Sequence, residues 1–216
     1  MDKPRIGISV GDLNGIGMEL IIKTLMDPRI THYCTPIVYG SSRTASYHRK
    51  VLGVNDWSFN LINEASAANP KRANLVTVWQ DEVNIQLGQA DPEVGKYAFT
   101  SLEAAVKDLQ AGQIDALVTA PINKDTIQSD QFRFPGHTEY LQEAFGAKEV
   151  LMFLVSDKLR VGTVTGHVPL REVAGKLNTN DILRKLQIMH RSLLIDFGIR
   201  RPRIAVLSLN PHAGDN

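Results

Sequence analysis

The chain has 216 residues, of which 43% are hydrophobic and 22% charged, as in a folded globular protein of one large or two small domains. Its formal net charge is +1, and no basic run is long enough to follow a nucleic-acid backbone. A single cysteine excludes an internal disulfide, and no apolar stretch resembles a signal segment or a membrane span, so we expect a cytoplasmic protein without nucleic-acid or membrane partners.

Strand and helix patterns alternate along the first half of the chain. Short apolar runs predict strands at residues 6–10, 36–39, 59–62, 75–79 and 116–119. Helical spacing predicts helices at residues 18–26, about 42–52 and 93–111, and Gly112 is placed to end the last of these. Alternation of this kind predicts an α/β fold with a largely parallel sheet.

The second half continues the alternation. We expect a helix at residues 138–145, strands at 150–155 and 160–164, a long helix at 180–197 capped by Asn180 or Thr179, and a last strand at 204–209. The polar stretch at 121–136 places a domain boundary there, giving domains 1–125 and 126–216. Because a final parallel strand needs a following element to cover it, we expect the C-terminal part of the fold to be missing from this chain.

A glycine-rich turn, Gly11-Asp12-Leu13-Asn14-Gly15-Ile16-Gly17, joins the first strand to the first helix. A turn in this position can bind anions, because free N–H groups and the helix dipole favour negative charge. Its spacing matches neither the dinucleotide fingerprint nor the P-loop. Two interpretations stay open: a tight turn in which Asp12 or Asn14 caps the helix, and a loop that also lines the active cleft.

A second polar loop, Thr119-Ala120-Pro121-Ile122-Asn123-Lys124, ends the strand at 116–119. Lys124 could neutralise a phosphate or carboxylate, act as an acid or base with a lowered pKa, or simply lie on the surface.

Three histidines lie in loops that contain glycine or proline: His137, His167 and His212. His137 and Thr138 begin the helix at 138–145, where Thr138 can act as a cap and the pair can offer donors to a phosphate. The runs before His167 and His212 read as buried strands, and the carboxyl ends of parallel strands are where α/β sheets bind ligands. These two imidazoles therefore predict a metal or anion site, with a third ligand from elsewhere.

Five segments in order give the chain a specific resemblance to the 4-hydroxythreonine-4-phosphate dehydrogenase family of pyridoxal phosphate biosynthesis. They are the turn at 11–17 with Met18-Glu19, the loop Thr119-Ala120-Pro121-Ile122-Asn123-Lys124, Phe134-Pro135-Gly136-His137-Thr138-Glu139, Thr165-Gly166-His167-Val168-Pro169-Leu170 and Leu209-Asn210-Pro211-His212-Ala213-Gly214. The chain departs from the family pattern at Leu13, Asn14, Met18 and Gly166, which affects the fine shape of the cleft.

The resemblance implies a two-domain fold with a cleft, akin to isopropylmalate and isocitrate dehydrogenases, and a homodimer with its active site at the subunit interface. It implies NAD- or NADP-dependent oxidation and decarboxylation of 4-phosphooxy-L-threonine to 3-amino-2-oxopropyl phosphate. It assigns His137 and Thr138 to substrate binding, and His167 and His212 to a divalent metal, which would be zinc, cobalt, nickel or magnesium. The third metal ligand and the remaining substrate contacts would lie beyond residue 216.

Three other functions remain open at this stage. The first is a related dehydrogenase of a four-carbon sugar-acid 4-phosphate, of the threonate or erythronate type. The second is a non-catalytic domain that binds a phosphorylated ligand without metal. The third is an enzyme similar to phosphate acetyl- or butyryltransferases, which would need neither metal nor NAD.

Overall fold

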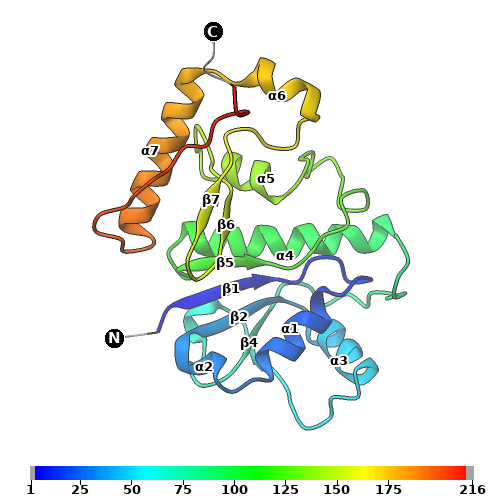
Figure 1. The fold of residues 1–216 in the computed structure, drawn as a ribbon. Helices are drawn as coiled ribbons and strands as arrows, with labels where there is room; N and C mark the ends of the chain where they lie inside the picture. Colours follow the sequence, from blue (N-terminus) through cyan, green and yellow to red (C-terminus); the bar gives the residue numbers. More distant parts are fainter. Residues whose placement is uncertain (1–2, 213–216) are drawn as a thin grey trace. The chain divides into compact units, whose positions relative to one another are not determined.

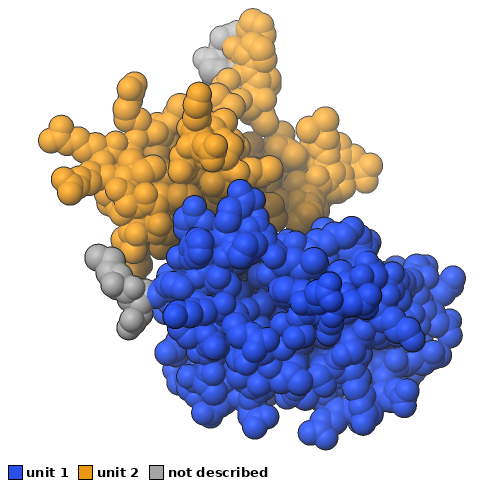
Figure 2. Space-filling view, turned by 90° about the horizontal axis from the view of Figure 1, so that it is seen from below, with its two compact units in different colours: residues 1–146 blue, residues 147–216 orange. Residues whose placement is uncertain are grey.

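The computed structural model describes residues 3–212 of the chain. The chain forms two compact units, Met1–Gly146 and Ala147–Asn216, coloured separately in Figure 2, and each is described by itself. The units divide at residue 146, whereas the sequence places a domain boundary at residue 125. A compact unit is not necessarily a domain of the complete fold, so the predicted domain division stays a prediction.

The first unit contains a five-stranded sheet whose strands are all parallel. In chain order the strands are β1 (Arg5–Ser9), β2 (Thr35–Gly40), β3 (Asn60–Ile62), β4 (Asn74–Thr77) and β5 (Ala116–Thr119), and in space they run β3-β4-β2-β1-β5. The predicted α/β fold with a largely parallel sheet is thereby confirmed for this unit, and the prediction of β5 matches to the residue.

The helices of the first unit are α1 (Gly17–Leu25), α2 (Ile30–Tyr33), α3 (Ser42–Val51), α4 (Pro92–Gln110) and α5 (His137–Ala144), with a 3₁₀ turn at Ala65–Ala67 (Figure 1). The long helix α4 starts where the Asp91 side chain accepts a hydrogen bond from the Glu93 N–H and ends before Gly112. Gly112 has φ +69°, a conformation that favours glycine, so its predicted role as a helix stop is confirmed.

Helices cover both faces of this sheet, which is why its central strand β2 is buried throughout. On one face, Val38 and Leu75 pack with apolar residues of α1 and α3. On the other face, Ile37 and Tyr39 pack with Ala105 of α4. The alternation along β2 therefore supplies two cores from one strand, and α4 also packs on its far side against α5 and the loop before it.

The second unit is smaller and far more open. It has an antiparallel pair, β6 (Phe153–Val155) and β7 (Arg160–Gly162), and two helices, α6 (Leu170–Lys176) and α7 (Thr179–Ile195). Among its described residues only Leu193 is a buried apolar side chain. Side chains that the sequence suggests should form a core are therefore largely exposed here.

Three predictions for this unit are wrong. Residues 204–209 form no strand, because no neighbouring strand pairs with them, and Leu207 is 90% exposed. The strand predicted at 160–164 stops at Gly162. The long helix is capped neither by Asn180 nor by Thr179, because the Asn178 side chain already accepts from the Asp181 N–H.

Within residues 3–212, none of the helices combines the length and the apolar character needed to cross a lipid bilayer.

Candidate functional site

The order of the strands defines one point in the sheet where ligands are expected. From β1 the chain passes through α1 to β2 on one side, while β5 lies on the other side of β1. The connections therefore diverge at the carboxyl ends of β1 and β5. In open α/β sheets, such a switch point is where the crevice for a ligand forms. The two loops that leave these strands are the glycine-rich turn and the loop that carries Lys124.

A main-chain contact joins these two loops. The Asp12 N–H donates to the Pro121 carbonyl across 2.9 Å. Gly11 has φ +67°, and a Cβ built on it would lie only 2.2 Å from the same Pro121 oxygen. Only glycine allows this approach without displacing the backbone. The turn therefore contacts the Lys124 loop as well as joining β1 to α1. This contact favours the second interpretation, in which the turn also lines the candidate cleft.

Neither Asp12 nor Asn14 caps α1, so this part of the sequence interpretation is wrong. The Asp12 carboxylate accepts from the Asn14 N–H at 3.0 Å, and Ile16 precedes the helix without a side-chain cap. The buried Asn14 side chain instead donates to the Gln89 carbonyl at 3.0 Å and accepts from the Gln86 N–H at 2.9 Å. Asn14 thus fastens a separate loop across the glycine-rich turn.

The Lys124 loop is held by side-chain amides. The Asn123 side chain accepts from the N–H groups of Asp125 and Thr126, which forms a tight turn around Lys124. The Gln128 amide donates to the carbonyls of both Lys124 and Phe134, at 3.1 and 2.9 Å. Gln128 therefore ties the Lys124 loop to the segment that leads into α5.

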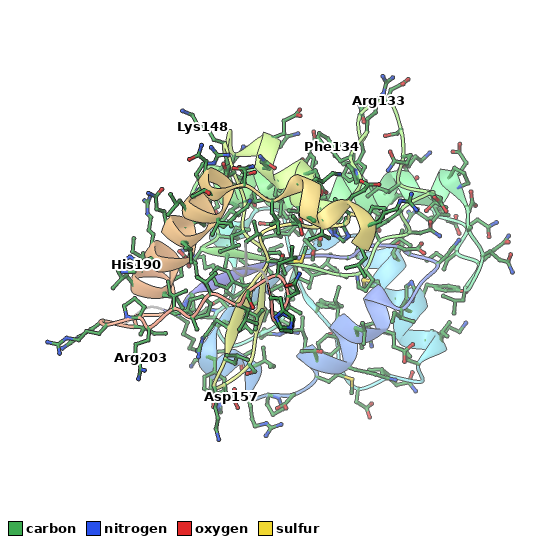
Figure 3. The ribbon with its side chains drawn as sticks, turned by 45° about the horizontal axis from the view of Figure 1, so that its top comes forward. Arg133, Phe134, Lys148, Asp157, His190 and Arg203 are labelled. Carbon is green, nitrogen blue, oxygen red and sulfur yellow. The ribbon has the colours of Figure 1, made fainter. Side chains whose placement is uncertain are left out.

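The structure places His137 at the first position of α5, with Gly136 before it. Thr138 lies inside the first turn, so its predicted role as a cap is wrong, because the helix begins one residue earlier than expected. Aromatic rings hold this region: Phe132, Phe134 and Tyr140 lie within 5.4–5.6 Å of one another, centroid to centroid. Figure 3 shows Phe134 beside Arg133 in the loop ahead of α5.

His137 is half-buried, and its surroundings disfavour the protonated form of the ring. Burial lowers the pKa of its imidazole, and the nearby positive charge of Lys124 lowers that pKa further. Its Nε2 atom is buried and has no hydrogen-bond partner among the described residues. A Cβ built on Gly136 would lie 4.0 Å from the Cε of Lys124, which places the two cationic or potentially cationic groups in one small region.

His167 and His212 are both exposed and belong to the second unit. His167 follows β7 in a left-handed conformation with φ +48°, which is uncommon outside glycine. The main-chain N–H of His212 donates to the side-chain oxygen of Asn210 at 3.0 Å. The argument that both follow parallel strands is wrong, since β7 pairs antiparallel and residues 204–209 form no strand. Their convergence on one metal stays a prediction, and Ala213 and Gly214 of the last motif lie outside the described residues.

The described residues alone do not complete a catalytic metal site. Imidazoles such as those of His167 and His212 suit zinc, cobalt or nickel, but a catalytic zinc site uses about three protein ligands. No group of three histidine, cysteine or carboxylate side chains that could hold a metal occurs in residues 3–212. The part of the chain that the structure describes therefore offers at most two of the ligands, and we derive no catalytic step through a metal.

The second unit also contains a cavity of about 540 Å³ between β7, α7 and residues 199–207. Its walls are mostly apolar, and none of the four predicted site residues lines it.

Sequence reasoning missed Gln128 and misassigned Asn14, because the roles of both residues depend on partners in other loops. No local pattern marks either residue. The one available signal for Asn14 is that the family usually has a small residue at this position. A small residue could not make the two hydrogen bonds that the Asn14 side chain makes here.

The fold is that of an α/β protein with a parallel sheet, and its switch point is the candidate ligand site. A family model described as pyridoxal phosphate biosynthetic protein PdxA matches residues 32–216. The 4-hydroxythreonine-4-phosphate dehydrogenase of Bacteroides thetaiotaomicron is 51% identical over 215 residues, covering 99% of this chain. The chain therefore belongs to this family, and the resemblance noted in the sequence is confirmed.

More distant relatives carry two different names. The D-threonate 4-phosphate dehydrogenase of Cupriavidus necator is 34% identical over 220 residues, which cover 99% of this chain and 64% of the relative. The crystal structure of a 4-hydroxythreonine-4-phosphate dehydrogenase from Burkholderia phymatum matches with a TM-score of 0.86 at 32% identity, covering 100% of this chain and 65% of the other. The chain spans 59% of the length of the Bacteroides relative.

Proposed function

We propose that the protein oxidises 4-phosphooxy-L-threonine with NAD or NADP, and that the product loses CO₂ to give 3-amino-2-oxopropyl phosphate. Membership in the family carries the proposal, and the structural observation that agrees with it is the contact between the Asp12 N–H and the Pro121 carbonyl. This contact brings the glycine-rich turn and the Lys124 loop together at the switch point, in the same unit as His137 and Thr138. Family membership and the names of the relatives support the same chemistry.

The proposed reaction needs one oxidation and one bond cleavage. The carbon that bears the hydroxyl gives a hydride to the nicotinamide, and the hydroxyl proton passes to solvent. The carboxyl group then lies β to a ketone and leaves as CO₂, after which the carbon takes up a proton. His137 and Thr138 hold the anionic end of the substrate, which fixes the reacting carbon in place.

A divalent metal bound at His167 and His212 would supply Lewis acidity for both steps. We propose that its third ligand and the remaining substrate contacts come from outside the described residues. We also propose a cytoplasmic homodimer whose active site lies at the subunit interface.

The test is steady-state turnover by the polypeptide as its gene encodes it. NADH formation is measured with 4-phosphooxy-L-threonine, with D-threonate 4-phosphate and with 4-hydroxy-L-threonine as the unphosphorylated control. Turnover of the first substrate at the highest kcat/KM supports the proposal. A preference for the second would favour the alternative named by the 34% identical relative. The same protein, purified without a histidine tag, is analysed for metal, because a non-catalytic phosphate-binding domain would contain none.

A further inference from the structure

The main chain around Lys124 is held by hydrogen bonds, while its side chain is exposed. The turn formed by Asn123 and the two hydrogen bonds of Gln128 fix its main chain. Its ammonium group makes no ion pair or hydrogen bond among the described residues. Most exposed lysines are free in this way, so the position alone decides nothing.

The neighbouring imidazole makes the position unusual. The Nε2 atom of His137 is buried without a partner, and Lys124 lies close enough for its charge to oppose protonation of that ring. A buried ring nitrogen without a partner is unfavourable in the absence of a ligand, and the positive charge of Lys124 disfavours protonation of the same ring. A carboxylate oxygen of Glu139 lies 3.6 Å from a Cβ built on Gly136, yet Glu139 forms no ion pair with Lys124 among the described residues.

An anion that reached both groups would give the His137 nitrogen a partner and pair with the charge of Lys124. It would accept a hydrogen bond from the Lys124 ammonium group and another from the His137 imidazole, and its charge would offset the repulsion between them. A phosphate suits this arrangement better than a carboxylate, because three terminal oxygens can accept from several donors at once.

We propose that Lys124 is the residue that recognises the phosphate of the ligand, and that it does so together with His137. This inference rests on the proposed function, which assigns the anionic end of the substrate to His137 and Thr138 but gives Lys124 no role. It makes Lys124 the side chain that separates a phosphorylated substrate from its unphosphorylated counterpart.

The experiment measures inorganic phosphate binding to the 216-residue chain at constant ionic strength, with the His137 ring signals followed by NMR. We expect saturable binding that raises the pKa of His137, because the bound anion favours the imidazolium. Lys124→Ala should weaken phosphate binding by about tenfold or more and raise the pKa of His137 in the free protein. Lys124→Arg should retain binding to within about threefold, because it keeps the charge.

Lys50→Ala is the matched control, since it removes one positive charge from an exposed position on α3 of the same unit. Its phosphate affinity should equal that of the unaltered chain. Equal losses in Lys50→Ala and Lys124→Ala would overturn the proposal, because the effect would then be that of net charge. Unchanged affinity in Lys124→Ala would overturn it as well. If Lys124→Ala kept its phosphate affinity and that affinity depended on His137, only the role of Lys124 would fail and the proposed function would stand. If Lys124 binds phosphate but the protein oxidises no phosphorylated substrate, only the proposed function fails.

Discussion

The hydroxyl of Ser101, on α4, donates a hydrogen bond to the carbonyl of Tyr39 across 2.6 Å. The same hydroxyl accepts from the N–H of Val10 at 2.9 Å. Tyr39 lies near the end of β2 and Val10 directly follows β1, so a single buried hydroxyl satisfies two main-chain groups at the carboxyl ends of neighbouring strands. The hydrogen-bond ladder between β1 and β2 ends at this point, at the pair Ser9 and Tyr39.

Ser101→Ala should therefore destabilise the chain by about 2 kcal/mol, because it leaves a buried N–H and a buried carbonyl without partners. Chemical denaturation monitored by circular dichroism measures the loss. Thr100→Ala is the neighbouring control: Thr100 is less buried, and its hydroxyl bonds only to the Lys96 carbonyl within the same helix. A loss no greater than in this control would show that water replaces the missing contacts.

Gly95 allows α4 to approach the turn that follows Lys124. A Cβ built on Gly95 would lie 1.9 Å from the Thr126 carbonyl oxygen. Gly95→Ala should cost about 3 kcal/mol of stability, since the helix or the turn must move. It should also weaken phosphate binding, because Thr126 lies next to the Lys124 turn. Gly175→Ala, in α6, meets no atom within 4 Å and should leave phosphate binding unchanged.

His48 gives the first unit a dependence on pH. The ring is 3% exposed, and burial lowers its pKa below the ordinary 6.5, with the Leu13 carbonyl and Glu19 only partly offsetting this effect. The unfolded chain therefore binds a proton at higher pH than the folded one does. The contribution of the neutral His48 ring to the free energy of unfolding is therefore fully present above about pH 6.5. It is lost as the pH falls toward the lowered pKa of the folded protein. His137 acts in the same direction, since its pKa is also lowered.

His48→Gln should flatten this pH dependence, measured as the free energy of unfolding between pH 7.5 and 5. Asp27 does not interfere, because the Arg29 side chain lowers its pKa to about 2, below this window. His190→Gln, at an exposed position on α7 (Figure 3), serves as the control and should keep the original slope. An unaltered slope in His48→Gln would assign the effect to other groups.

His167→Ala tests the proposed metal ligand. Turnover by the polypeptide as its gene encodes it should be lost, and zinc retained after dialysis should fall by at least about tenfold. His190→Ala should retain both. Near-normal turnover in His167→Ala would refute the assignment.

Patterns local to one segment were predicted well from the sequence. The apolar run of β5 and the glycine after α4 need no partner to be recognised, and both were placed correctly. The four-residue helix α2 was missed because it is too short to show a periodicity. Residues 204–209 have the composition of a strand, but a strand exists only where another pairs with it.

For the candidate site, the sequence singles out the loops, which stay a prediction, but it does not show what connects them. The local pattern favours Asn14 as a helix cap, because asparagine is one of the residues preferred at that position. Its partners, Gln86 and Gln89, lie more than 70 residues away in the chain, and no spacing rule relates them. The convergence of His167 and His212 depends likewise on long-range geometry, and it stays a prediction.

The junction between Asp12 and Pro121 consists of main-chain atoms alone. Such a joint does not depend on which side chains surround it, apart from the glycine at position 11. Residues that face the ligand can therefore be exchanged while the frame that presents them keeps its shape. A scaffold of this kind can change its preference among similar ligands through a few substitutions, without having to evolve a new architecture.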